Sequence, residues 1–230
     1  MFKPDPYFFP ELPANLLETI SCQEVNIGDQ TIKIVSPSTP DALLDHSSVH
    51  IAYEQDEYMP YWASLWPVAV FLAEEIEQRS WPANISAVEV GCGLGLAGLV
   101  AAKKNIKVLF TDYDSNALTF AKKNCELNGV HQVDFELLDI RHPMDRKFNL
   151  IIVSDLIYER RNVEPLVQLI GQMLEENGSA LVSDQGRPYQ ENFLTCLSEN
   201  GFEWTEIKKK LFNSEKKEVT GYVFTIKRRN

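Results

Sequence analysis

The chain has 230 residues, 44% of them hydrophobic and 24% charged, with a formal net charge of −11 at pH 7. This composition predicts one α/β domain of ordinary size with a proper core. The acidic balance disfavours nucleic acid as the main partner, because phosphate binding requires a basic face. The longest apolar run is far below the ~20 residues of a membrane span, so no membrane association is expected.

The cysteines and the N-terminus indicate the compartment. The four cysteines are scattered without a C-x-x-C pair, which predicts reduced thiols and neither a disulfide framework nor a zinc site. The opening stretch MFKPDPYFFPELP is rich in proline and acidic residues, unlike a basic, apolar secretory signal. We therefore expect a cytoplasmic protein.

Residues 1–59 are predicted to form an extension that is irregular apart from one β-hairpin. In QEVNIGDQTIKIVSP, two pairs of apolar residues flank a Gly28-Asp29 turn signal: Val25 and Ile27 before it, Ile32 and Ile34 after it. The next segment, PYWASLWPVAVFLAEEIEQ, is predicted to be a helix that opens at Pro60. Its apolar face would carry Leu65, Val68, Leu72 and Ile76.

Strand and helix patterns alternate from Ile85 onward. Strands are predicted in SAVEV, IKVLFTD, VDFELLD, FNLIIVSD and SALVSD. Helices are predicted in LGLAGLVAAKK, SNALTFAKKNCELNG, VEPLVQLIGQMLEENG and YQENFLTCLSENG. The second of these helices has Ser115 as a plausible N-cap and Gly129 as its stop.

The chain closes with FEWTEIKKKLF and VTGYVFTIKRR, two strands without a helix between them. A series of βα units followed by such a hairpin implies a parallel sheet with an antiparallel edge. The predicted fold is therefore a Rossmann-like, seven-stranded, mostly parallel sheet with an antiparallel C-terminal hairpin and helices on both faces, preceded by an N-terminal β-hairpin extension.

The stretch VEVGCGLGLAG contains two glycine motifs in overlapping frames. Read from Gly93 it is G-x-G-x-x-G, the pattern of dinucleotide sites. Read from Glu89 it is an acidic residue followed by G-x-G-x-G, which is typical of proteins that hold S-adenosylmethionine. In a dinucleotide site the first glycine makes the turn directly behind the strand; here that is Gly91, and the third glycine would then fall at Leu96. The second frame is therefore favoured, with Gly93 and Gly95 letting the backbone approach a ligand.

Two acidic residues at the ends of the following strands agree with this frame. Asp112 ends the second strand of the alternating region, 21 residues after Gly91 (112 − 91), where its carboxylate can accept hydrogen bonds from both ribose hydroxyls. Asp139 closes the third strand, where it can reach the adenine edge. Either residue alone could be a turn former or a helix cap. Together with the glycine turn they favour a nucleoside cofactor, S-adenosyl-L-methionine.

The segment from about Tyr58 to Pro188 resembles the seven-β-strand protein lysine methyltransferases, which carry a D-x-x-Y motif after the fourth strand. That motif is present as SDLIY, with Asp155 and Tyr158. The stretches PYWASLWP, NCELN and DQGRP are similar to segments of the type that methylates the electron-transfer flavoprotein β-subunit. The resemblance implies a methyltransferase domain over residues 60–230 that converts S-adenosyl-L-methionine to S-adenosyl-L-homocysteine and holds no metal.

The resemblance also implies the site residues. It places Asp155 and Tyr158 at the target amine as catalytic residues. It implies cofactor contacts at Trp66, Glu89, Gly91, Cys92, Gly93, Asp112, Asp139 and Ser154.

A lysine substrate fits the chemistry of these residues. Methyl transfer needs a neutral amine, and the free lysine pKa is about 10.4. An apolar, aromatic-walled channel lowers that pKa by desolvation, and Tyr61, Trp62 and Trp66 could face the cationic centres. Asp155 could orient the amine and Tyr158 supply a wall and a hydroxyl. The alternative interpretations are a helix-capping Asp155, a packed Tyr158 and an aromatic core plug in PYWASLWP.

We therefore predict a monomeric N-methyltransferase whose partner is a protein presenting a lysine. The alternatives are methylation of a metabolite amine and a cofactor-binding module without catalysis. His46 and His50 stand four residues apart beside Asp45, but no third ligand is well placed, so surface histidines are expected. Cys92 is expected to form the loop backbone and not to act as a nucleophile.

Overall fold

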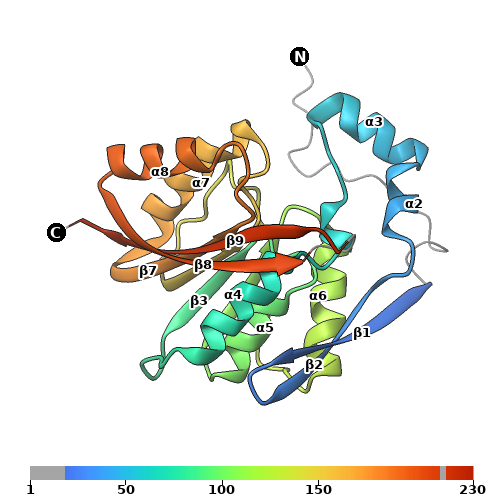
Figure 1. The fold of residues 1–230 in the computed structure, drawn as a ribbon, viewed down its shortest axis with the longest axis horizontal. Helices are drawn as coiled ribbons and strands as arrows, with labels where there is room; N and C mark the ends of the chain where they lie inside the picture. The colour runs from blue at the N-terminus through green and yellow to red at the C-terminus, as the bar shows by residue number, and fades with distance from the viewer. Residues whose placement is uncertain (1–18, 213–215, 230) are drawn as a thin grey trace.

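The computed structural model describes residues 19–212 and 216–229. Its centre is a seven-stranded sheet in the order β5-β4-β3-β6-β7-β9-β8, and β1 and β2 form a separate two-stranded sheet (Figure 1). The strands are β1 Ile20–Ile27, β2 Gln30–Pro37, β3 Ser86–Val90, β4 Lys107–Asp112, β5 Asp134–Leu137, β6 Phe148–Ser154, β7 Leu174–Asp184, β8 Phe202–Phe212 and β9 Glu218–Arg228. The helices are α2 Pro40–Leu44, α3 Ser47–Asp56, α4 Pro67–Gln78, α5 Leu96–Lys103, α6 Ser115–Leu127, α7 Arg160–Met173 and α8 Gln190–Glu199, with a 3₁₀ turn η1 at Tyr61–Ala63.

The pairing of the strands confirms the predicted fold class. β3 pairs in parallel with β4 and β6, β4 with β5, and β6 with β7. β9 pairs antiparallel with both β7 and β8. The five parallel strands therefore all end at one edge of the sheet, where such folds bind their ligands.

Helices cover both faces of the sheet, and each face has its own hydrophobic core. α4, α5 and α6 pack on one face, and α7 and α8 on the other (Figure 1). Side chains of β6 alternate between the cores, with Leu150 and Ile152 in the first and Ile151 and Val153 in the second. This double burial explains why the strand is almost entirely apolar.

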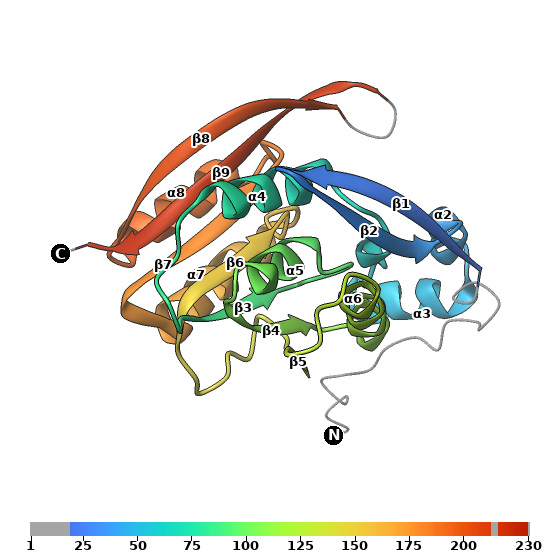
Figure 2. The same cartoon turned by 90° about the horizontal axis from the view of Figure 1, so that it is seen from below.

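β8 is the outer strand of the sheet, and within residues 19–212 and 216–229 no strand pairs with its other edge (Figure 2). The hairpin that it forms with β9 pairs from Phe202–Arg228 to Phe212–Glu218. Three consecutive lysines lie on this strand and pair with glutamates: Lys208 with Glu206, Lys209 with Glu74, and Lys210 with Glu218. Among the described residues, no helix is long and apolar enough to cross a bilayer.

The predicted N-terminal hairpin is confirmed, with Val25 opposite Ile32 and a positive φ at Gly28. The sequence analysis missed the helices α2 and α3 that follow it. α3 buries only Val49 and Ala52, so its sequence lacks a clear apolar period. His46 is the N-cap of this helix, and its Nδ1 accepts a hydrogen bond from the Ser48 N–H at 3.3 Å. The division of the chain into residues 1–59 and 60–230 stays a prediction.

Three predicted helix boundaries were wrong. The helix expected to open at Pro60 begins at Pro67, because the residue before a proline favours extended backbone, and Trp66 has ψ 142°. Asp114, not Ser115, caps α6, and its carboxylate accepts from the Asn116 N–H. The predicted helix VEPLVQLIGQMLEENG corresponds to α7, which ends at Met173. It ends there because the next residue, the buried Leu174, already pairs with Phe148 as the first residue of β7.

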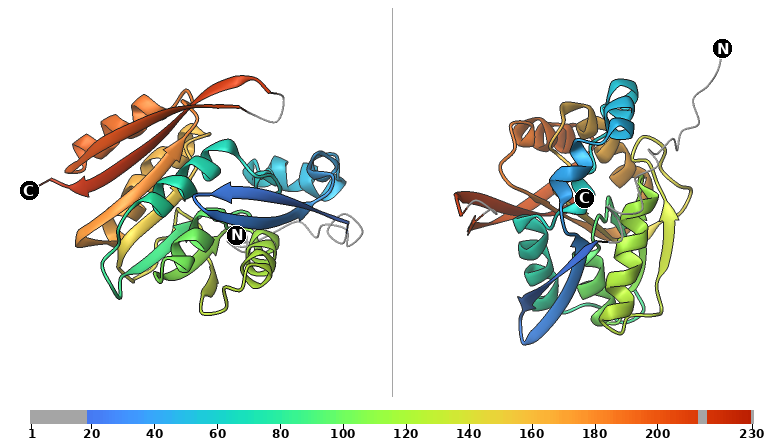
Figure 3. Two further views of the ribbon diagram at one scale, coloured as in Figure 1. Left: turned by 60° about the horizontal axis from the view of Figure 1, so that its bottom comes forward. Right: turned by 90° about the vertical axis from the view of Figure 1, so that its right-hand side faces the viewer.

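The N-terminal hairpin lies beside α6 (Figure 3). Asn124 of this helix and its C-cap residue Asn128 attach the hairpin to the rest of the fold. The buried Asn124 side chain accepts from the Val35 N–H at 2.7 Å and donates to the Val35 and Leu94 carbonyls at 3.1 and 2.9 Å. One turn later, Asn128 makes the same exchange with the backbone of Lys33, at 3.0 and 2.7 Å. Because the Leu94 carbonyl belongs to the glycine loop, Asn124 joins the hairpin to that loop.

We expect Asn124→Ala to lower the free energy of unfolding by about 2–4 kcal/mol, because three buried backbone groups lose their partner at once. Asn128→Ala is the matched control; water can replace its exposed contacts, so a loss of about 1 kcal/mol is expected. Urea unfolding of both variants measures the difference. Equal losses would show that the buried amide has no special role in attaching the hairpin.

Candidate active site

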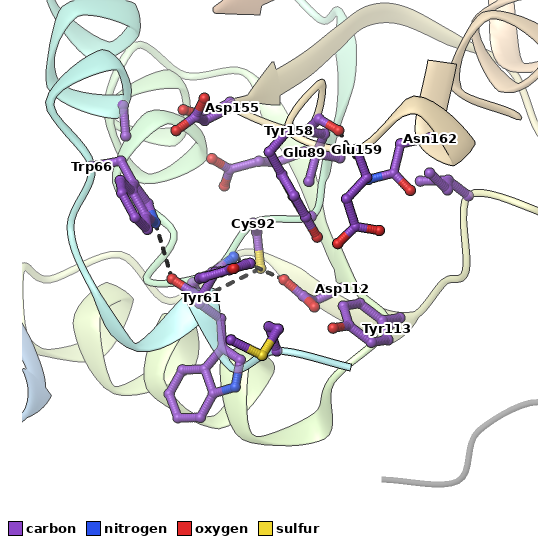
Figure 4. Close-up of a pocket in the computed structure, with 18 of the residues that line it drawn as sticks. Tyr61, Trp66, Glu89, Cys92, Asp112, Tyr113, Asp155, Tyr158, Glu159 and Asn162 are labelled. Atoms are coloured by element: carbon purple, nitrogen blue, oxygen red, sulfur yellow. Dashed lines mark hydrogen bonds between the residues drawn. The ribbon is translucent and has the colours of Figure 1, made fainter. Parts of the chain in front are cut away.

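A cavity of about 340 Å³ lies at the edge where the parallel strands end. This volume falls in the range of small-molecule sites. All ten residues predicted from the sequence line it: Trp66, Glu89, Gly91, Cys92, Gly93, Asp112, Asp139, Ser154, Asp155 and Tyr158. Figure 4 shows Asp155 and Trp66 at one end of the cavity and Asp112 and Tyr113 at the other.

The glycine loop forms the floor of the cavity. Gly91 has φ 61°, and a Cβ there would lie 2.8 Å from the Leu156 side chain, so the turn behind β3 requires glycine. The Cys92 N–H donates to the Thr111 carbonyl at 2.9 Å, and burial raises the pKa of its thiol, in line with a backbone-forming role. A Cβ at Gly95 would lie 2.9 Å from the Ala121 Cβ. Packing against α6 therefore requires a small residue here. Gly95 also lines the cavity, and its approach to a ligand stays a prediction.

Asp112 ends β4 and supports the loop from the side. Its carboxylate accepts from the Gly93 N–H at 2.9 Å and from the Asp114 N–H at 3.0 Å. Burial raises the pKa of Asp112 to about 7, although these backbone donors act in the opposite direction. The carboxyl group retains acceptor capacity toward the cavity, which suits a pair of hydroxyl donors.

Asp139, on the same side of the cavity, is held by Arg141. Arg141 Nε lies 3.0 and 2.8 Å from the two carboxylate oxygens, and the Arg141 N–H also donates to Oδ1, at 2.8 Å. Burial alone would raise the pKa of Asp139, but the contacts with Arg141 outweigh it and hold the pKa below its usual value. Arg141 continues to Asp56 at the end of α3, with two hydrogen bonds of 2.9 and 2.8 Å. Asp139 thus anchors the rim of the cavity as well as lining it.

Glu89 on β3 is a buried carboxyl with an unused oxygen. Its Oε2 has no hydrogen-bond partner among the described residues. Burial raises the pKa of Glu89 to about 8, and the backbone N–H groups of Gly98 and Ala97 offset only part of this effect. At neutral pH Glu89 is therefore mostly protonated. Glu89 lines the cavity, but its Oε2 lies against α5, where a Cβ on Gly98 would be 2.5 Å from it.

Asp155 follows β6 in an unusual backbone conformation, with φ 53°. Its N–H donates to the Ser183 carbonyl at 2.9 Å, which fixes the turn against β7. Arg187 grips the carboxylate with two donors, Nε at 3.1 Å and Nη2 at 2.8 Å. α7 begins at Arg160 with Glu159 as its N-cap, so Asp155 does not cap that helix. The capping interpretation left open by the sequence is wrong.

Three aromatic side chains wall the cavity near Asp155. The Tyr61 ring meets Tyr158 at a centroid distance of 5.3 Å and Trp66 at 6.1 Å, both edge to face. The Trp66 Nε1–H donates to the Tyr61 carbonyl at 3.0 Å, which holds the indole in place. Trp62 also lines the cavity and is buried against Phe120, with the ring centroids 5.5 Å apart.

The sequence analysis missed four residues at this site: Asp56, Arg141, Gln185 and Arg187. The stretch DQGRP was noticed only for its likeness to the family, and nothing in it pointed to a contact with Asp155. A third rim arginine, Arg161, pairs with Asp56, Glu57 and Glu159. Within residues 19–212 and 216–229, no cluster of three or more histidine, cysteine or acidic side chains has the geometry of a metal site.

The residues present fit S-adenosylmethionine. The cavity has suitable volume, the backbone turns tightly beneath it, and Asp112 offers acceptors toward it. Glu89, which lines the cavity, and the aromatic faces suit a ligand that carries positive charge.

Known proteins agree with this geometry. Residues 46–200, or 155 of 230 (200 − 46 + 1), match the family described as lysine methyltransferase. The chain is 25% identical over 186 residues to the histone-arginine methyltransferase METTL23 of Mus musculus, with 75% of this chain and 70% of that protein covered. It is 28% identical over 134 residues to the electron transfer flavoprotein beta subunit lysine methyltransferase of the same species, with 56% and 52% covered.

Among solved structures, the ribosomal protein L11 methylase of Lactobacillus delbrueckii subsp. bulgaricus matches with a TM-score of 0.56 and 25% identity, over 69% of this chain and 78% of that one. The chain spans 40–70% of the length of curated relatives such as these. The family match covers more than half of the chain and includes the glycine turn, the acidic strand ends and D-x-x-Y. The resemblance predicted from the sequence is confirmed: the chain belongs to the lysine methyltransferase family and is an S-adenosylmethionine-dependent methyltransferase.

Proposed function

We propose that this chain transfers a methyl group from S-adenosylmethionine to the side-chain amine of a lysine in a protein. The observation that carries the proposal is the arrangement of one buried carboxylate, Asp155, and three aromatic walls at the end of a cavity whose other end has nucleoside-binding features. The relatives described above act on proteins according to their names, which supports a protein substrate.

The reaction needs positioning more than acid–base machinery. When bound, S-adenosylmethionine supplies an electrophilic methyl group on a sulfonium. The lysine nitrogen must approach in line with its lone pair free, and holding it in that geometry provides much of the rate. Burial among aromatic rings disfavours the charged ammonium, which makes the neutral amine more available.

Asp155 and Tyr158 have complementary parts in this proposal. Asp155 accepts a hydrogen bond from the amine and favours the positive charge that develops on nitrogen as the C–N bond forms. Burial raises the pKa of Tyr158, so its phenol stays protonated and can only donate or accept hydrogen bonds. Its ring, held edge to face by Tyr61, forms the wall that sets the angle of approach.

Label transfer tests this proposal directly. The protein is incubated with S-adenosylmethionine labelled in its methyl group and with a protein extract, and the extract is then freed of small molecules and hydrolysed. We expect label in a protein band and in methylated lysine. Label only in the low-molecular-weight fraction would mean a metabolite amine, and label in methylarginine would mean an arginine target.

We expect Asp155→Asn to lower turnover on the labelled protein by at least ~10²-fold, because the variant keeps the shape of the side chain and loses its charge. It should fold normally and bind S-adenosyl-L-homocysteine nearly as well as the parent. Asp145→Asn, an exposed aspartate away from the cavity, is the control and should retain parental turnover. If Asp155→Asn also retains it, Asp155 is not at the reacting amine.

The ionisation of Glu89 gives a prediction that does not depend on turnover. If Glu89 faces the α-ammonium of the cofactor, binding favours the charged form of Glu89. In the free protein burial raises the pKa of Glu89 to about 8, so binding at a pH below this value releases a proton. The affinity for S-adenosyl-L-homocysteine should then rise as pH increases from 6 to 8. Calorimetry in buffers of different ionisation enthalpy should detect release of roughly one proton at pH 7.

Glu89→Gln is the matching variant, since it keeps the shape and cannot ionise. Its affinity should be nearly flat between pH 6 and 8, with most of the proton release lost. Proton release equal to that of the parent would assign the titration to another group, with Asp112 the first candidate because its pKa is raised to about 7.

A further inference from the structure

The carboxylate that is proposed to meet the substrate amine already holds a cation. Arg187 reaches both oxygens of Asp155, and Gln185 Nε2 donates to Oδ2 at 2.5 Å. The Asp155 side chain is 4% exposed, whereas that of Arg187 is 31% exposed. The arginine therefore covers the carboxylate from the open side of the cavity.

The loop after β7 is built to hold this pair. The Arg187 N–H donates to Asp184 Oδ1 at 2.8 Å, and Gly186 turns the chain with φ 71°. A guanidinium stays charged at every pH the protein meets, and its planar fork matches a carboxylate. A substrate ammonium or amine can take its place on Asp155 only if Arg187 moves aside.

An arginine released from Asp155 needs a new counter-charge. Its guanidinium already lies 5.6 Å from the centre of the Trp66 ring, so a short movement would keep it over that face at the cavity wall. The carboxylate that remains close to Arg187 is Asp184, which is fully buried and already accepts the Arg187 N–H. A carboxylate brought by the substrate would complete the exchange, because Arg187 would keep an ion-pair partner while Asp155 accepts a hydrogen bond from the amine.

We propose that Arg187 is a specificity-determining residue that holds Asp155 in the free enzyme, yields it to the substrate lysine, and then pairs with a carboxylate next to that lysine. The inference rests on the proposed function, and it adds a substrate class: a lysine with a neighbouring acidic residue. It also explains why isolated amines would bind poorly, since they bring no partner for the displaced arginine.

The first test uses n-butylamine as the probe, bound to the complex with S-adenosyl-L-homocysteine at pH 8 and followed by ligand-observed NMR. Arg187→Met keeps much of the side-chain stem and removes the charge. If the pair is closed for about nine-tenths of the time or more, the variant should bind n-butylamine at least ~10-fold more tightly than the parent. Arg79→Met is the control, because Arg79 pairs with Glu75 at similar exposure away from the cavity, and it should change nothing.

The second test compares two peptides, Nα-acetyl-Lys-Asp-amide and Nα-acetyl-Lys-Asn-amide, in the same assay. The parent should prefer the aspartate peptide by at least ~5-fold, the scale of a partly exposed charge pair. Arg187→Met should lose that preference. Arg187→Lys keeps the positive charge and loses the planar guanidinium, so its preference for the aspartate peptide should lie between those of the parent and Arg187→Met. This variant serves as the test if Arg187→Met does not fold.

The outcomes separate this inference from the proposed function. Unchanged or weaker n-butylamine binding in Arg187→Met, or an equal preference in parent and variant, overturns the role of Arg187 even if label transfer to lysine succeeds. A loss of S-adenosyl-L-homocysteine affinity in Arg187→Met would assign the arginine to the cofactor instead. If no lysine is labelled by the parent, the proposed function fails, whereas tighter amine binding still supports displacement of Arg187 from Asp155.

Discussion

Six carboxyl groups are buried where the parallel strands end, and the cost of removing them from water is the constraint around which the rest of the site is organised. They are Glu89, Asp112, Asp114, Asp139, Asp155 and Asp184. Charge of one sign in a low-dielectric environment is costly unless it is neutralised or paired. The protein uses both solutions: arginines reach in to Asp139 and Asp155, and burial raises the pKa of Glu89, Asp112 and Asp184.

This constraint gives the acidic composition a local meaning. A net charge of −11 alone serves solubility as readily as recognition. The six buried carboxyl groups, in contrast, lie together at one edge of the sheet, where they favour a cationic ligand. A sulfonium brings positive charge, and so does an amine that becomes an ammonium. Stability of the free protein and ligand binding therefore make opposite demands. An arginine that pairs with a buried carboxylate stabilises the free protein, and a cationic ligand must then displace that arginine or bind beside it.

The N-terminal extension completes the site instead of decorating it. Asp56, at the end of α3, receives Arg141 from across the rim of the cavity. Its hairpin is fastened to the glycine loop through Asn124. Folding of the extension and shape of the cavity are therefore coupled, although the two segments are far apart in the chain.

The sequence predicted what depends on periodicity and local backbone demands. The uninterrupted apolar run from Leu150 to Val153 is typical of a strand covered on both faces, and Gly91 together with the strand-end acids predicted where the ligand site would form. The ion pair between Arg187 and Asp155 was not predicted, because the two residues are 32 positions apart and such a pair leaves no periodic pattern in the sequence. The sequence analysis missed α3 because few of its residues are buried. It missed the packing of Gly95 against Ala121 because the two residues become adjacent only in the folded chain.

The position of β8 at the edge of the sheet affects how the protein avoids strand pairing with other molecules. A long edge strand exposes unpaired backbone donors and acceptors, a ready template for a strand of another molecule. Here an apolar residue, Ile207, is 43% exposed and Phe212 is 66% exposed on that strand, which would favour such pairing. The run Lys208 to Lys210 lies between them, and each of its lysines pairs with a glutamate. Charged side chains on an edge strand oppose edge-to-edge pairing. This charged run therefore works against strand-to-strand aggregation, whereas Ile207 and Phe212 favour it.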